Sequence, residues 1–262
     1  MSVEGSHKKT VQRRKKILEL LDTEGEVFVE HLSDHFDVSE VTIRKDLESL
    51  EKNNLLLRAR GGAIRLKSGV GVDYRISEKH RLNYQEKVLI GKFAAGLVRN
   101  GDTIILDSGT TTLEMAKHFP PDIEATVITN ALNIATTLSS HIYVNVIVPG
   151  GSLRKNSISL VGPLAEKTLR SFHVDKAFLG IDGIDTRSGF YTPNMEEAYL
   201  NRIMIEIAEE SILLSDSSKF VRKSLNLVCG IGDIDALVTD EGLSANDKKL
   251  LEDAGVKVYI AK

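Results

Sequence analysis

The sequence predicts an α/β protein in two parts: a small helical segment that ends in a β-hairpin, and a larger domain built on a mostly parallel sheet. Three observations support this. Apolar residues recur at helical spacing over the first fifty residues, and from about residue 85 short apolar runs alternate with helical patterns. Those runs are continuous, as strands buried on both faces require. With 262 residues, of which 42% are hydrophobic, the chain is long enough for both parts.

Composition excludes several classes of protein. The single cysteine, Cys229, rules out an internal disulfide framework and a thiolate zinc site, and it fits a reducing compartment. Residues 1–16 are polar and basic, and no apolar run approaches the roughly 18 residues of a membrane span. We therefore expect a cytoplasmic protein that uses no membrane, metal or cofactor. The net charge is −3, but the N-terminal part is the more basic one and is expected to meet a polyanion.

The N-terminal part begins with a predicted helix over residues 11–21, whose outer face is basic because of Arg13, Arg14, Lys15 and Lys16. A short helix over 31–36 follows, then a tight turn that ends with Ser39 as N-cap. From Ile43 to Leu50 the apolar residues recur at i, i+4 and i+7, which predicts a helix of about three turns. Two short helices joined by such a turn are the helix-turn-helix arrangement, whose second helix enters the major groove of DNA.

Residues 55–65 predict two short strands around a glycine turn, which is the wing of a winged helix. Arg58, Arg60 and Arg65 would lie along this hairpin, where they can reach phosphates or the minor groove. A solvated run of charge on a surface hairpin is the alternative. The order of helix, turn, helix and basic hairpin favours DNA. Because Glu40 makes the reading face partly acidic, Arg44 and Lys45 are expected to carry the main contacts.

The remaining chain predicts a linker and then a parallel sheet. We place the winged helix-turn-helix at 10–67, a polar, glycine-containing linker at 68–84 and an α/β domain at 85–262. Strands and helices then alternate, which implies a sheet with helices on both faces. The expected strands are 103–106, 125–128, 144–148, 176–180, 211–214, 236–238 and 257–260, and the expected helices are 85–99, 111–119, 131–139, 163–172, 196–210 and 244–254.

Polar and glycine-rich segments follow the first five strands, and in a parallel sheet they meet at one edge, where open α/β sheets bind ligands. Carboxylates and amides there can bind hydroxyls, and cations can bind a phosphate. Each segment alone also fits a loop, a helix cap or a solvated side chain. The candidate residues are Asp107, Ser108, Gly109, Thr110, Thr111 and Thr112, then Asn130, then Gly150, Gly151 and Arg154, then Asp182, and finally Lys219.

The first of these segments, residues 107–112, predicts an anion site. Unpaired N–H groups at a helix start carry partial positive charge, the hydroxyls add donors, and Gly109 allows close approach of the backbone. Asp107 would repel a bare phosphate but accept hydrogen bonds from hydroxyls, so a polyol phosphate suits the segment better. An ordinary strand-to-helix turn capped by Ser or Thr is the alternative.

These motifs resemble the DeoR family of bacterial transcription factors over about residues 10–262. Residues 38–47 with Arg58 and 61–63 are similar to its DNA-binding module, and the strand-end segments are similar to its effector domain. The resemblance implies a repressor or activator that binds double-stranded operator DNA as a dimer or tetramer and responds to a phosphorylated sugar. It also implies an effector domain with the fold of ribose-5-phosphate isomerase.

The resemblance also assigns residues. The DNA-reading residues would be Ser39, Glu40, Thr42, Arg44 and Lys45, and Glu197 and Asn201 match a further family segment without an assigned role. Arg60 departs from the family, in which many members carry His or Tyr at this position, so the contact made by the wing is open.

An isomerase-like enzyme is the competing function, because Asp182 and Asp185 resemble an acid pair for proton transfer. A shared fold is not evidence of activity, and an enzyme has little use for a winged helix. A nucleic-acid-binding protein without a ligand would leave the converging polar segments unexplained. We therefore expect a transcriptional regulator, a repressor of a carbohydrate-utilisation operon, with no catalytic residues.

Overall fold

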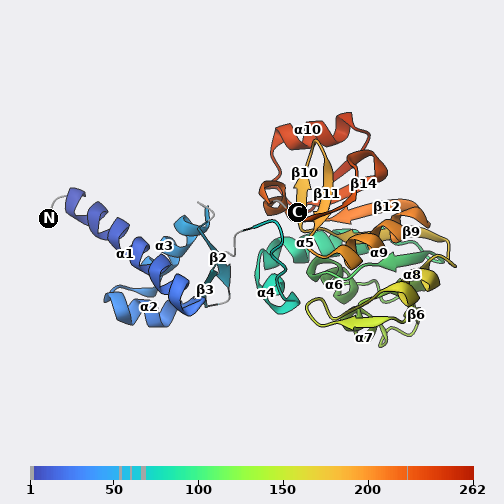
Figure 1. The fold of residues 1–262 in the computed structure, drawn as a ribbon, viewed down its shortest axis with the longest axis horizontal. Helices are drawn as coiled ribbons and strands as arrows, with labels where there is room; N and C mark the ends of the chain where they lie inside the picture. Colours follow the sequence, from blue (N-terminus) through green and yellow to red (C-terminus); the bar gives the residue numbers. More distant parts are fainter. Residues whose placement is uncertain (1–2, 53–54, 60, 66–68, 223) are drawn as a thin grey trace. The chain divides into compact units, whose positions relative to one another are not determined.

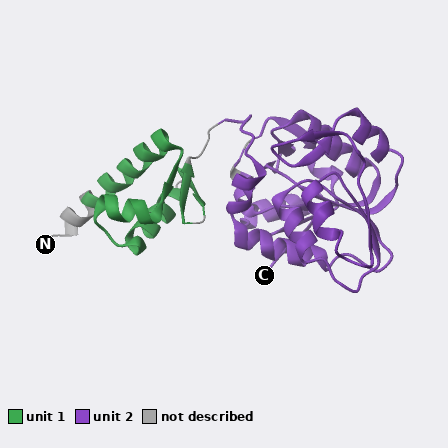
Figure 2. Ribbon diagram, turned by 90° about the horizontal axis from the view of Figure 1, so that it is seen from below, with its two compact units in different colours: residues 1–68 green, residues 69–262 purple. Residues whose placement is uncertain are grey.

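The computed structural model describes residues 3–52, 55–59, 61–65, 69–222 and 224–262. The chain divides into two compact units, residues 1–68 and 69–262 (Figure 2). One predicted DNA-contacting residue, Arg60, lies outside the described residues.

The first unit is a winged helix-turn-helix. Its three helices pack on a three-stranded antiparallel sheet with the order β1-β3-β2 (Figure 1). Ile17, Leu32, Ile43 and Leu47 are among the residues of its apolar core. The elements are α1 (Val3–Glu24), β1 (Glu26–Phe28), α2 (Val29–Phe36), α3 (Glu40–Lys52), β2 (Leu56–Ala59) and β3 (Gly62–Arg65).

Two adjacent glycines shape the wing, each for a different reason. Gly61 has a φ of +80°, which a side chain would strain. At Gly62 a Cβ atom would lie 1.9 Å from the carbonyl oxygen of Val27, so β1 and β3 can pair here only because the side chain is missing. The pair therefore makes the turn and closes the small sheet.

The second unit is built on a seven-stranded sheet with the order β15-β14-β12-β9-β4-β5-β6, in which every neighbouring pair is parallel. This confirms the predicted α/β architecture. Its strands are β4 (Thr103–Leu106), β5 (Ala125–Thr129), β6 (Val144–Ile147), β9 (Val174–Gly180), β12 (Ala208–Leu214), β14 (Ala236–Thr239) and β15 (Lys257–Ile260).

Helices cover both faces of this sheet (Figure 1). In β4, Ile104 and Leu106 belong to one apolar core and Ile105 to the other, as the period of a strand requires. One core includes residues of α5 (Tyr84–Ala95), α6 (Thr110–Lys117) and α7 (Leu132–Leu138). The other includes residues of α8 (Pro163–Leu169), α9 (Met195–Glu206) and α10 (Ala245–Asp253). Within the described ranges, no helix combines the length and apolar character that crossing a bilayer requires.

Short antiparallel pieces at the sheet's edge were not expected from the sequence. One is the hairpin of β7 (Ser152–Arg154) and β8 (Ser159–Val161). Another is a sheet of β10 (Gly183–Asp185), β11 (Gly189–Thr192) and β13 (Asn226–Cys229), against which the 3₁₀ helix η1 (Ser217–Val221) packs. A second 3₁₀ helix, η2 (Ile231–Asp233), follows β13 in the chain.

The segment predicted as a linker, residues 68–84, differs from that prediction. From Gly69 onward it belongs to the second compact unit. It contains a short helix, α4 (Ile76–Arg81), with no buried residue of its own. A six-residue helix without an apolar stripe gives no periodic signal, which is why the sequence pattern indicated only a polar connection.

Candidate functional site

A pocket lies at the point where the order of the parallel strands reverses. From β4 the sheet continues through β5 and β6 on one side, and from β9 it continues through β12 on the other. The loops after β4 and β9 therefore diverge and leave a crevice at the carboxyl ends of the strands. The pocket is lined by Tyr74, Ile76, Lys79, Lys87, Asp107, Ser108, Gly109, Thr110, Thr111, Asn156, Ser157, Gly180, Ile181, Asp182, Thr192, Glu197, Asn201, Leu214, Ser215, Asp216 and Lys219.

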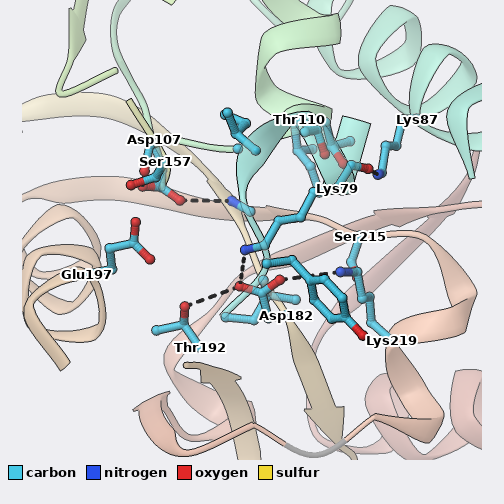
Figure 3. A pocket seen from close by; sticks show the side chains of 18 of the residues that line it. Lys79, Lys87, Asp107, Thr110, Ser157, Asp182, Thr192, Glu197, Ser215 and Lys219 are labelled. Atoms are coloured by element: carbon cyan, nitrogen blue, oxygen red, sulfur yellow. Dashed lines mark hydrogen bonds and ion pairs between the residues drawn. The ribbon is translucent and has the colours of Figure 1, made fainter. Parts of the chain in front are cut away.

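Two lysines meet at one carboxylate in this pocket. Lys79 Nζ lies 2.8 Å from Asp182 Oδ2, and Lys219 Nζ lies 3.4 Å from Asp182 Oδ1. Figure 3 shows the two ammonium groups approaching Asp182 from different sides. Burial alone would raise the pKa of Asp182, but the two lysines outweigh it and hold that pKa below its usual range. Asp182 is therefore an ionised counter-ion at neutral pH.

A third lysine, Lys87 of α5, is almost completely buried at the same pocket. Its Nζ donates to the backbone carbonyl oxygen of Lys79 at 2.5 Å. Burial, reinforced by the charge of Lys219, lowers the pKa of Lys87 to about 7. The amine thus changes its charge near neutral pH, and an incoming anion would favour its protonated form.

Asp107 is a carboxyl group of the same pocket whose pKa, like that of Lys87, is shifted toward neutral pH. Burial, followed by the charge of Glu197, raises its pKa to about 7. Asn201 donates to its carboxylate in either orientation of the amide, and the backbone N–H of Gly180 donates to Oδ2 at 3.3 Å. Near neutral pH, Asp107 can therefore either donate or accept a hydrogen bond.

Asp216, which follows β12, has a buried carboxylate oxygen to which no described residue donates a hydrogen bond. Its Oδ1 accepts from Asn83 and Ser218, but among the described residues Oδ2 has no hydrogen-bond partner. Burial would raise the pKa of Asp216, but Lys219 and Lys87 lower it, so the group is ionised. A buried carboxylate oxygen without a donor is costly, and a ligand hydroxyl would satisfy it.

The start of α6 borders the same pocket. Its N-cap is Gly109, without a side-chain cap, and Thr110 and Thr111 of the first turn line the cavity. The first amide groups of a helix have no partner inside it, so they can face an anion. Gly91 of α5 fixes the position of α6, because a Cβ there would lie 2.6 Å from the backbone nitrogen of Met115.

Most of the predicted pocket residues line the cavity, but five do not. Thr112 is buried and donates to the carbonyl oxygen of Gly109 at 3.1 Å. Asn130 donates to the carbonyl oxygen of Leu160 at 3.3 Å. Gly150 and Gly151 form a turn with positive φ that packs on Leu164 and Ala165 of α8. These residues shape the surrounding loops and lie outside the cavity lining.

Arg154, the fifth, was expected to supply positive charge for a phosphate. Its guanidinium instead pairs with Asp73 and, at 2.9 Å, with Glu197. It therefore positions two acids at the margin of the pocket. Sequence reasoning missed several lining residues, above all Lys79 and Lys87. Lys79 lies in the segment predicted as a linker, and Lys87 lies in a predicted helix whose pattern gave it no special role. The described residues contain no cluster of three or more side chains suited to a metal ion.

The predicted DNA-reading residues lie at the start of α3 in the first unit. Ser39 accepts from the backbone N–H of Thr42 at 3.3 Å, which confirms the expected cap. Arg44 and Lys45 are exposed, and Arg44 pairs with Glu40 at 2.5 Å. Arg58 lies in β2, where its backbone N–H donates to Glu51, and its side chain is half-buried.

The expected basic outer face of α1 needs correction. Arg13 and Arg14 turn inward and bind the buried carboxylate of Asp46 at 2.5 and 2.8 Å. Arg14 also donates to Ser49 at 2.6 Å. Lys15 and Lys16 remain exposed. The sequence pattern of α1 shows only its own apolar stripe, so it could not reveal that a charged residue of α3 faces the arginines.

Two family models match the chain in the order of its two units. The "DeoR-like helix-turn-helix domain" matches residues 13–69, and the "DeoR C terminal sensor domain" matches residues 82–241. The chain belongs to the DeoR family. It is accordingly a DNA-binding regulator of transcription.

Relatives of this DeoR-family protein match over nearly its whole length. The "Uncharacterized HTH-type transcriptional regulator YulB" of Bacillus subtilis is 42% identical over 94% of this chain and 95% of that protein. The "Putative aga operon transcriptional repressor" of Escherichia coli O157:H7 is 40% identical over 96% and 94%. A solved structure of ribose 5-phosphate isomerase A from Methanocaldococcus jannaschii covers 53% of this chain and 55% of that one, with 19% identity and a TM-score of 0.41.

Proposed function

We propose that this DeoR-family protein represses a carbohydrate-utilisation operon in the cytoplasm and is controlled by a phosphorylated sugar bound in the pocket after β4, β9 and β12. The main support for this proposal is that one cavity contains both positively charged groups and an ionised hydrogen-bond acceptor. Lys79, Lys87 and Lys219 offer positive charge, whereas Asp216 offers an ionised acceptor oxygen that lacks a donor.

A phosphorylated sugar satisfies both chemistries. Its phosphate would face the lysines and the first turn of α6, because both attract an anion. Its hydroxyls would donate to Asp216 and exchange hydrogen bonds with Asp107. A free sugar would leave the lysines without an added counter-ion, and a bare phosphate would leave Asp216 without a donor. The name of the aga operon relative, a repressor of an operon, supports the same class of function.

For DNA, we propose that α3 enters the major groove and that Ser39, Glu40, Thr42, Arg44 and Lys45 contact operator bases and phosphates. Arg58 and Arg60 of the wing would add contacts to the backbone or the minor groove. Operator binding by such modules commonly uses two half-sites, so we propose a homo-oligomer, a dimer or a tetramer. The salt dependence of operator affinity would report the number of phosphate contacts.

A screen of sugar phosphates by thermal unfolding tests the effector. Each phosphorylated sugar is compared with its unphosphorylated parent at the same concentration. A ligand at 100 times its dissociation constant adds about 2.7 kcal/mol to the stability of the form that binds it. We expect a stabilised transition with at least one phosphorylated sugar and none with the parents. Equal shifts with both would refute a phosphate-dependent site.

An operator titration tests the control. The protein is titrated onto DNA from the promoter region upstream of its own gene and neighbouring genes, with and without the phosphorylated sugar chosen by the screen. A coupling free energy of about 1–3 kcal/mol changes operator affinity about 5- to 150-fold. The same factor must appear in the effector affinity measured with and without operator, because coupling is reciprocal. Identical affinities would eliminate the proposed control.

A further inference from the structure

The pocket is covered on one side by the chain segment that leads into the DNA-binding unit. This segment, residues 73–83, is called the strap below. Tyr74, Ile76 and Lys79 of the strap line the cavity together with loops that come much later in the chain. In the sequence, the strap begins a few residues after the wing, so any change in its position bears on the connection between the two units.

Polar contacts hold the strap in place at both ends and in the middle. Near its start, Asp73 binds Arg154 and accepts from Asn156 at 2.9 Å, while the N–H of Ile76 donates to the carbonyl oxygen of Asn156 at 2.7 Å. At its end, Asn83 donates to Asp216 and Ser218 at 2.7 and 2.8 Å. In the middle, Lys79 binds Asp182.

Apolar packing contributes little to this arrangement. Of residues 73–83, all of them described, only Leu82 is buried. A segment with few buried apolar contacts, whose hydrogen bonds and ion pairs can be replaced by water, opens locally at low free-energy cost. The position of the strap therefore depends on the charges beneath it.

Lys79 is the charged strap residue that lines the cavity. It shares Asp182 with Lys219, so one carboxylate serves two ammonium groups. Its backbone carbonyl also accepts from Lys87, which ties the strap to the third lysine of the pocket. The charge of Glu197 also acts on Lys79 and that of Asp216 on Lys219, so an anion that enters between these lysines adds a further counter-ion to the group. Figure 3 shows the side chain of Lys79 reaching from the strap toward Asp182 in the interior of the pocket.

We propose that Lys79 is an anion-binding residue through which the bound effector clamps the strap onto the sensor domain. The inference rests on the proposed function, because it assumes an anionic effector in this pocket. It adds a route by which ligand binding is transmitted to the DNA-binding unit. The ligand holds residues 73–83 against the sensor domain, and these residues are joined through residue 72 to the chain that leads back to the wing. Lys219 binds the same anion from η1, and its side chain pairs with Asp182, which lies outside residues 73–83.

Hydrogen exchange of the full-length protein tests the clamp, with inorganic phosphate as the probe and sodium chloride at equal ionic strength as the reference. Calorimetry gives the occupancy of phosphate in each sample. In the unaltered protein we expect phosphate to slow amide exchange in residues 73–83 at least threefold, with no comparable change in α10. In Lys79→Met, phosphate affinity falls about 10-fold, as for one lost charge-assisted bond, and the slowing disappears at matched occupancy.

Lys219→Met is the matched control, because it removes the other ammonium group at Asp182 and leaves the strap intact. It should also lower phosphate affinity, but at matched occupancy the strap should still be protected. Loss of protection in both variants alike, or phosphate binding without any slowing in residues 73–83, would overturn the clamp while leaving the proposed effector site standing. If phosphate and sugar phosphates both fail to bind, the proposed function falls, and the clamp falls with it. Thermal unfolding of each variant verifies that it folds.

Discussion

The carboxylate of Asp46 accepts a hydrogen bond from Arg14 Nε at 2.8 Å, and this bond ties the second helix of the DNA-binding motif to α1. Arg13 binds the other oxygen of the same carboxylate. Asp46 is 2% exposed, so both bonds form at the inner face of α3. The orientation of α3 against α1 is thereby set in part by two arginines that lie about thirty residues earlier in the chain.

The first prediction concerns this cluster. Asp46→Ala should destabilise the DNA-binding unit by about 3–5 kcal/mol, because it leaves two arginines without their buried counter-ion. Calorimetric unfolding of the full-length protein measures the loss. Asp34→Ala, on the exposed surface of α2, is the control and should change stability by less than about 0.5 kcal/mol. Equal effects of the two substitutions would contradict the structural role of the cluster.

The second prediction separates DNA contact from effector binding. Arg44→Ala should weaken operator binding by about 1–3 kcal/mol if Arg44 reads a base, or reduce the salt slope by about one unit if it contacts a phosphate. Effector affinity should not change. Glu40→Ala removes the partner of Arg44 in the free protein and tests whether Glu40 itself reads DNA. If Arg44→Ala binds the operator as tightly as the unaltered protein does, Arg44 does not contact DNA as proposed.

The third prediction is a pH dependence of anion binding. As the pH falls through about 7, Lys87 gains a proton and becomes positive, and Asp107 gains a proton and becomes neutral. Both changes make the pocket more positive, so affinity for a phosphorylated sugar should increase from pH 8.5 to pH 6.5. Calorimetry across this range measures it. Below about pH 6 the phosphate itself loses charge and the trend should level off.

Single substitutions assign the two groups. Asp107→Asn and Lys87→Met should each flatten the pH profile, because each removes one titrating group. A profile as steep as that of the unaltered protein in both variants would show that other groups are responsible. Asp107→Asn also changes stability: with a folded pKa above its unfolded value, the carboxyl destabilises the fold increasingly as the pH rises from about 4 to 7. The variant should therefore lose less stability than the unaltered protein over that range.

The fourth prediction tests the packing that positions α6. Gly91→Ala should destabilise the sensor domain by about 1–3 kcal/mol, because the added Cβ would lie within 3 Å of the α6 backbone and push the helices apart. Effector affinity should fall as well, since α6 begins at the pocket. Gly232→Ala is the control, because a Cβ there meets nothing within 4 Å. Thermal unfolding and calorimetry of both variants measure the difference.

Most of the architecture could be predicted because it depends on short-range patterns. Continuous apolar runs indicated the strands of the parallel sheet, and i, i+4 spacing in residues 43–50 indicated α3. Several helix ends were placed too far along the chain: the helices expected over 85–99 and 163–172 end at Ala95 and Leu169, and the helix expected over 196–210 ends at Glu206, after which β12 begins at Ala208. Residues 207–210 are good helix formers, but pairing with β9 draws them into the sheet.

The candidate site could be predicted in part. Asp107, Asp182 and Lys219 were found because each follows a strand of one parallel sheet, and Glu197 and Asn201 because they match a family segment. Lys79 could not be found this way, because its place at the pocket depends on a strap held by contacts with residues far along the chain. Arg154 was assigned the wrong partners for the same reason: its two carboxylates, Asp73 and Glu197, come from distant parts of the sequence.

Because the pocket depends on the pairing of β4 with the much later strand β9, it can form only late in synthesis. The first unit has all its strands and helices by residue 65, and N-terminal units generally fold first as the chain emerges. The pocket needs β4, β9 and β12 together, because Asp107, Asp182 and Lys219 follow them. A nascent chain can thus fold its winged helix-turn-helix well before the pocket exists, so premature termination after the wing would release a DNA-binding fragment without the proposed effector site.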